Sequence, residues 1–191
     1  LLDHGHRRQA PRVLCVSWGY FVNRRYHPSY PATSYFLFEQ QKLELLGGFP
    51  HVEVLLKPYP GSPGAELLNR VVAGMGWRHI TVLEEGQFSD WLPHADLLVL
   101  DYQGTPLVEA LASAKPLILY LDERFQQLTP EAEKALSKRA TVARTPEALL
   151  AALRERLVSR DFGELADPDD EFLRLYGTHL NDGRSLERAY R

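Results

Sequence analysis

The sequence contains a single cysteine, Cys15, among its 191 residues. One cysteine excludes an intramolecular disulfide and any zinc site built on several thiolates. Long apolar runs are also missing: the longest, such as residues 97–100 and 117–121, fall far short of the roughly 20 residues of a membrane helix. The N-terminus lacks the charged and apolar regions of a signal peptide. These absences favour a cytoplasmic, reducing environment.

An excess of positive charge is absent as well. Lys and Arg number 22 and Asp and Glu 25, for a formal net charge of −3, so a general nucleic-acid binder is not expected. With 45% hydrophobic and 25% charged residues, the composition is that of a globular chain, long enough to bury a core without covalent crosslinks. The sequence begins without an initiator methionine, and its one methionine is Met75. We therefore expect it to be a piece of a longer protein.

Six short apolar runs predict buried strands. They are residues 13–18, 52–57, 80–83, 97–101, 117–121 and, more weakly, 140–143. Continuous runs, rather than strict alternation, are typical of strands covered on both faces, as in a parallel sheet.

Helical patterns alternate with these strands. Apolar stripes run over residues 67–75, 107–112 and 149–157. Thr105, Thr129 and Thr145 each precede a proline, which predicts a threonine N-cap followed by proline at the first helical position. The alternation predicts an α/β fold: a Rossmann-like open parallel sheet of about six strands with helices on both faces.

Two segments interrupt the alternation. Residues 19–34 are rich in aromatic and basic side chains without a clear period and predict a long loop after the first strand. After residue 160 the chain is rich in turn residues, and short helices are expected at residues 171–176 and from residue 184. The predicted organisation is an N-terminal linker (1–12), a Rossmann-like domain (13–160) and a C-terminal helical tail packing on it (161–191).

Ligands of open α/β sheets bind outside the carboxyl ends of the strands. The richest such segment runs from Asp101 through Gly104 and Thr105 to Glu109. A helix that begins at Thr105 would present free N–H groups to a phosphate, and Glu109, one turn deeper, could accept both hydroxyls of a ribose. Alternatively, Thr105 is only an N-cap and Glu109 a surface residue. The first strand is followed by neither a G-x-G-x-x-G nor a P-loop motif, which disfavours NAD and ATP-hydrolase functions.

Three motifs now resemble a known family. They are Lys57-Pro58-Tyr59-Pro60, the run from Ala95 to Thr105, and the run from Glu109 to Pro116. Together they look like the donor-binding half of a GT-B glycosyltransferase, close to bacterial surface-polysaccharide transferases and the glycerophosphotransferases of wall teichoic acid. The run from Tyr176 to Ser185 resembles the tail of transferases found with O-antigen genes.

The resemblance implies roles for particular residues. Glu109 would bind the donor ribose, and Gly104 and Thr105 would meet the diphosphate. Lys57 could neutralise phosphate or lie in solvent at the strand end, while Tyr59 stands where the family often has histidine.

Further residues could contribute to the same cleft. Arg24, Arg25 and His27 could contact the leaving diphosphate, although Arg24 and Arg25 could equally be a solvated pair. Trp18 could stack on a base or simply pack. Asp101 is a further candidate for the donor site and, with His27 and His179, lies at the expected cleft edge, but no catalytic base is assigned.

The resemblance also implies partners. The donor would be a nucleotide-activated sugar or polyol phosphate, bound without a metal or other cofactor. The carbohydrate acceptor and the catalytic base would come from an N-terminal domain, and peripheral membrane association of the full-length protein stays open. Two alternatives remain at this stage: a sugar-nucleotide epimerase of the same architecture, and a non-catalytic nucleotide-binding or interaction module.

Overall fold

A computed structural model describes residues 10–19, 31–62, 64–164 and 171–177 of the chain. Its six strands form one parallel sheet in the order β3-β2-β1-β4-β5-β6. The strands are β1 (Arg12–Val16), β2 (Glu53–Lys57), β3 (Ile80–Val82), β4 (Leu97–Leu100), β5 (Leu117–Tyr120) and β6 (Thr141–Ala143). All six match the predicted apolar runs to within two residues, and the α/β class with a Rossmann-like parallel sheet is confirmed.

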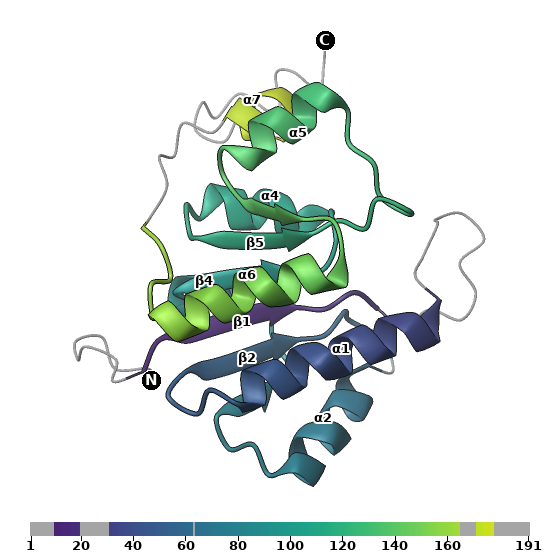
Figure 1. The fold of residues 1–191 in the computed structure, drawn as a ribbon, viewed down its shortest axis with the longest axis vertical. Coiled ribbons are helices and arrows are strands. Elements are labelled where there is room, and N and C mark those ends of the chain that lie inside the picture. The colour runs from purple at the N-terminus through teal and green to yellow at the C-terminus, as the bar shows by residue number, and fades with distance from the viewer. Residues whose placement is uncertain (1–9, 20–30, 63, 165–170, 178–191) are drawn as a thin grey trace.

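The helices cover both faces of this sheet. They are α1 (Ala32–Gly47), α2 (Gly64–Met75), α3 (Phe88–Trp91) with the 3-10 turn η1 (Leu92–His94), α4 (Thr105–Ala112), α5 (Pro130–Ser137), α6 (Pro146–Ser159) and α7 (Glu171–Tyr176). Figure 1 shows α1 and α6 lying side by side across the near face of the sheet. The helix α7 packs against α5, and Lys138 and Glu171 form an ion pair between them.

Side chains alternate between two cores because successive strand residues point to opposite faces. Val13 and Cys15 of β1 join a core with α1 and α6. Leu14 and Val16 join a second core with α4, α5 and α7. The inner strands β2, β1, β4 and β5 are therefore buried on both sides, which is why their sequences are almost continuously apolar.

The register of the central strands brings the carboxyl ends of β1 and β4 together. Val16 of β1 pairs with Leu100 of β4, and the chain order reverses between these two strands. In a doubly wound sheet this reversal opens a crevice for ligands. The residues after Val16 and Leu100 therefore lie at its mouth.

Three sequence expectations need correction. The loop predicted over residues 19–34 ends sooner, because α1 already begins at Ala32, while residues 20–30 lie outside the described part of the chain. Thr105 is the first residue of α4 and Gly104 its N-cap, with no side-chain capping bond. Met75, expected on an apolar stripe, is 56% exposed at the end of α2.

The other two Thr-Pro starts are confirmed. Thr129 Oγ1 accepts a hydrogen bond from the Ala132 N–H at 3.3 Å. Thr145 Oγ1 accepts one from the Ala148 N–H at 3.2 Å. These bonds satisfy N–H groups that the first helical turn otherwise leaves open.

Candidate functional site

A cleft of about 810 Å³ opens at the carboxyl ends of β1, β2, β4 and β5. Its lining residues are Trp18, Tyr59, Pro60, Tyr102, Gln103, Gly104, Thr105, Pro106, Phe125, Gln126 and Gln127. They come from the segments that follow the four strands, as the sequence predicted for a ligand site. This lining combines aromatic rings, amide groups and the hydroxyls of Tyr59, Tyr102 and Thr105, and its residues carry no formal charge.

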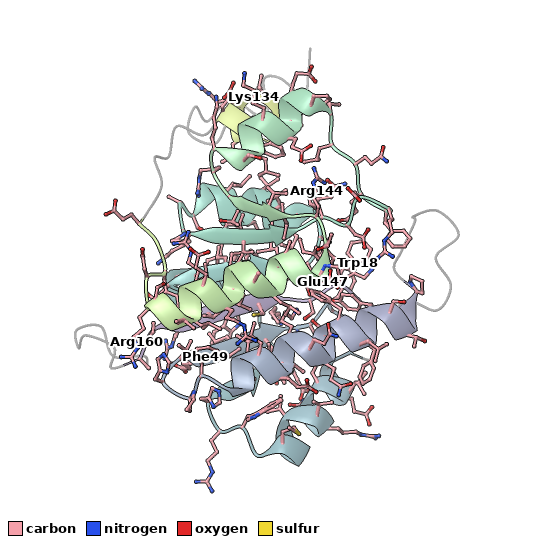
Figure 2. The ribbon with its side chains drawn as sticks, viewed as in Figure 1. Trp18, Phe49, Lys134, Arg144, Glu147 and Arg160 are labelled. Carbon is pink, nitrogen blue, oxygen red and sulfur yellow. The ribbon has the colours of Figure 1, made fainter. Side chains whose placement is uncertain are left out.

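The floor of the cleft is an aromatic pair. The rings of Trp18 and Tyr102 meet edge to face, with centroids 4.4 Å apart and planes at 80°. Trp18 follows β1 and Tyr102 follows β4, so the pair bridges the point where the strand order reverses. Figure 2 shows Trp18 on the same side of the molecule as Arg144 and Glu147, away from Arg160 at the other end of α6.

One wall of the cleft is the turn into α4. Gly104 and Thr105 are exposed there, and α4 begins without a side-chain cap. A Cβ on Gly104 would lie 2.7 Å from Cε2 of Tyr102, so the ring leaves room only for glycine. The start of α4 therefore presents main-chain N–H groups and the positive end of the helix dipole next to the cleft.

The facing wall is organised by Asp122, which is 1% exposed. Its carboxylate accepts hydrogen bonds from the Arg124 N–H and Nε at 2.9 Å and from the Tyr120 hydroxyl at 3.0 Å. Its carbonyl accepts from the N–H groups of Phe125 and Gln126. The bonds from Arg124 hold the pKa of Asp122 below its ordinary value, so the loop that carries Phe125 and Gln126 is fixed around an ionised carboxylate.

Glu109 lies one turn into α4, as predicted from its spacing to Thr105. It is half-buried and is not among the residues that line the cleft. Its assignment to a donor ribose stays a prediction.

The structure does not place Lys57 in solvent at the strand end, and its role toward a phosphate stays a prediction. The side chain is 5% exposed, and Nζ donates to the carbonyls of Leu83 and Glu85 at 3.1 Å each. Burial lowers the pKa of Lys57. Lys57 therefore fastens the segment after β3 to the end of β2 and does not lie in solvent.

Asp101 lies beneath the cleft, not on its wall. It is fully buried, and Oδ2 accepts from Lys42 Nζ at 2.6 Å and from the Tyr35 hydroxyl at 2.9 Å. Both partners come from α1, a helix that the sequence reasoning did not predict.

The buried partners on α1 were detectable in principle. Tyr35, Phe38, Glu39, Lys42 and Leu46 follow the i, i+3, i+4, i+7, i+11 spacing of one helix face. A glutamate and a lysine in register with apolar residues indicate a buried ion pair.

Several predicted residues fall outside the described part of the chain. These are Arg24, Arg25, His27 and His179, together with the helix expected from residue 184. The described residues hold no group of three or more His, Cys, Asp or Glu side chains suited to a metal ion. Within the same residues, no helix has the length and hydrophobicity needed to cross a membrane.

Comparison with known proteins gives a family and a fold. The sequence profile of the LIC12162 family transferases matches residues 33–145, more than half of the chain. No curated protein matches the chain significantly.

Solved structures share the fold at low sequence identity. A Listeria monocytogenes protein assigned as a UDP-N-acetylglucosamine 2-epimerase has 17% identity and a TM-score of 0.54, over 88% of this chain and 44% of its own. The glycotransferase of kitacinnamycin has 19% identity and a TM-score of 0.53, over 97% and 45%. ALG13 has 12% identity and a TM-score of 0.55, over 89% and 96%.

The chain thus spans less than half the length of the epimerase and the glycotransferase. The resemblance to a GT-B half-domain, predicted from the sequence, is confirmed at the level of the fold.

Proposed function

This chain belongs to the LIC12162 family of transferases, and from that premise we propose that it is the donor-binding domain of a glycosyltransferase. The donor is a nucleotide-activated sugar or polyol phosphate, and the product is part of a bacterial surface carbohydrate. Membership of a transferase family favours group transfer over the epimerase alternative.

One observation carries the proposal. The cleft at the strand reversal combines an aromatic floor with the start of α4, where no side chain caps the main-chain N–H groups. Trp18 and Tyr102 offer aromatic rings against which a base can pack. Gly104 and Thr105 offer N–H groups and a hydroxyl for a diphosphate. A nucleoside diphosphate has both parts, a flat base and an anionic tail, and a volume of about 810 Å³ accommodates it.

The cleft lacks charged side chains among its described lining residues, so we expect the negative charge of a leaving diphosphate to be stabilised by main-chain dipoles. Since the described lining residues are uncharged, the helix start of α4 is the electropositive element there. Main-chain N–H groups fixed in this way stabilise a developing diphosphate without reorganising during the reaction. We expect the acceptor and the catalytic base to come from a second domain, as in two-domain transferases of this architecture.

The proposal is tested by binding. The 191-residue chain is screened by thermal shift against UDP, GDP and CMP at millimolar concentration, and hits are titrated by calorimetry. We expect at least one to bind and Glu109→Ala to weaken it about tenfold, through lost contacts to the ribose hydroxyls. Glu147→Ala, at the start of α6, is the matched control with unchanged affinity. If all three nucleotides fail to bind, the proposal is wrong.

A further inference from the structure

Three charged side chains are buried together beneath the cleft. Glu39 and Lys42 come from α1 and Asp101 from the end of β4, and their side chains are 0–2% exposed. Lys42 Nζ lies 2.5 Å from Glu39 Oε1 and 2.6 Å from Asp101 Oδ2. One ammonium group therefore bridges two carboxylates.

Neutral donors complete the cluster only in part. The Ser17 hydroxyl donates to Glu39 Oε1 and the Tyr35 hydroxyl to Asp101 Oδ2, each at 2.9 Å. The other carboxylate oxygens, Glu39 Oε2 and Asp101 Oδ1, are buried without a hydrogen-bond partner among the described residues.

Stability alone does not account for such a cluster. Its formal charge is −1 when both carboxylates are ionised, and buried, unsatisfied oxygens oppose folding. Apolar side chains of similar volume commonly stabilise a fold at least as well as a buried ion cluster. The cluster lies directly beneath the cleft, which suggests a role in shaping the cleft.

Asp101 is joined directly to the cleft. The next residue is Tyr102, whose ring packs on Trp18 and leaves no room for a Cβ on Gly104. A shift of Asp101 would move the Tyr102 ring, and the ring fixes the path of the Gly104–Thr105 turn. Glu39 is linked to the cleft only through a hydrogen bond from the hydroxyl of Ser17, the residue before Trp18, and a glutamine oxygen could accept the same bond.

We propose that Asp101 is a positioning residue, which holds the Gly104–Thr105 turn in its binding geometry only while it is ionised and paired with Lys42. The significance of the turn for ligand binding rests on the proposed function. The dependence of the turn on Asp101 does not.

The surroundings of Asp101 place its ionisation in an accessible pH range. The groups facing it are Lys42, Glu39 and Tyr35 from α1 and the Cys15 thiol from β1. Burial, reinforced by the negative charge of Glu39, raises the pKa of Asp101 to about 6, against the opposing effects of Lys42 and Tyr35. Replacing Glu39 by glutamine should therefore lower this pKa, because it removes a negative neighbour.

The test compares two isosteric variants. Glu39→Gln and Asp101→Asn each remove one negative charge from the cluster and leave one carboxylate for Lys42. Lys42→Met would instead strand two carboxylates and could prevent folding, so it is not used. Circular dichroism melts establish that both variants are folded.

The first measurement needs no ligand. Backbone amide chemical shifts of Gly104 and Thr105 are followed by NMR from pH 4.5 to 8. We expect a transition near pH 6 in the wild type, a transition at lower pH in Glu39→Gln, and displaced signals without this transition in Asp101→Asn. If the two variants behave alike, or if Asp101→Asn keeps the wild-type signals of the turn, the positioning role is refuted.

The second measurement is binding of UDP, GDP and CMP at pH 7.5. We expect Asp101→Asn to lower affinity at least tenfold and Glu39→Gln to stay within twofold of wild type. If the wild type binds none of them but the turn titrates as described, the proposed function fails and the positioning role stands. If Asp101→Asn binds as tightly as wild type, the positioning role fails and the proposed function stands.

Discussion

The indole of Trp18 meets the phenol ring of Tyr102 at a centroid distance of 4.4 Å, across the reversal of strand order between β1 and β4. This contact joins the two central strands at the floor of the cleft. Trp18 and Gly104 both adjoin the Tyr102 ring, so a substitution at either position is expected to shift that ring and affect the other.

Trp18→Ala should weaken nucleotide binding about 5- to 150-fold, because stacking of a base on an aromatic ring contributes about 1–3 kcal/mol. Trp18→Phe should retain part of the affinity. Calorimetric titration measures both. Trp77→Phe is the control, because Trp77 packs beside Gly47 at the far end of α1. Unchanged affinity in Trp18→Ala would show that the indole only packs.

Gly104→Ala should lower nucleotide affinity about tenfold or more while the fold persists. The φ of Gly104 is 175°, an extended value that alanine also adopts, so the defect arises from the contact of the new Cβ with Tyr102. Tyr102→Leu in the same chain should relieve that contact and recover part of the binding. Gly74→Ala, which meets no atom within 4 Å, is the control. The steric account is wrong if Gly104→Ala binds like wild type.

The three Thr-Pro helix starts should differ in stability. Thr129→Ala and Thr145→Ala each remove a capping hydrogen bond, and each should lower the free energy of unfolding by about 1 kcal/mol. Thr105→Ala removes no cap and should cost less than about 0.5 kcal/mol. Urea denaturation measures all three, and equal losses would contradict the assignment of Gly104 as the N-cap of α4.

The four inner strands, β2, β1, β4 and β5, were predictable because burial on both faces makes them almost continuously apolar. The edge strands β3 and β6 have shorter apolar runs, in which Thr81 and Thr141 are exposed. The helix α1 was missed for two physical reasons. Pro31 precedes it without a side-chain cap, and Glu39 and Lys42 occupy core positions of its stripe. The first feature removes the capping residue that marks a helix start, and the second interrupts the apolar stripe that marks a helix interior.

The site was predictable only in outline. The segments after the strands do form the cleft, because parallel strands place their carboxyl ends at one edge. The direction of an individual side chain depends on its partner. Asp101 points into the protein because it pairs with the buried Lys42, which lies 59 residues earlier in the sequence. The spacing of residues along the sequence does not predict that Lys42 and Asp101 form an ion pair.

Asp101 should give the stability of the protein a measurable pH dependence. Its folded pKa, about 6, exceeds the ordinary value of 3.8 for an aspartate, so the folded state binds a proton more readily than the unfolded state between these values. The contribution of Asp101 to the free energy of unfolding is therefore greatest below pH 4 and is lost as the pH rises through about 6.

Urea denaturation at pH 4.5, 5.5 and 7 isolates this effect as the difference between wild type and Asp101→Asn. The wild type should lose about 1 kcal/mol or more relative to the variant over that range. Parallel pH profiles for the two proteins would refute the assignment.

Amide chemical-shift mapping tests the central claim most directly. The ¹⁵N-labelled chain is titrated with UDP, GDP and CMP, and the perturbed residues are located in the structure. Our account predicts saturable shifts for at least one nucleotide, centred on Gly104 and Thr105 and extending to Tyr59 and Phe125. Shifts confined to the opposite edge of the sheet, or none at millimolar concentration, would contradict a nucleotide-donor site in this cleft.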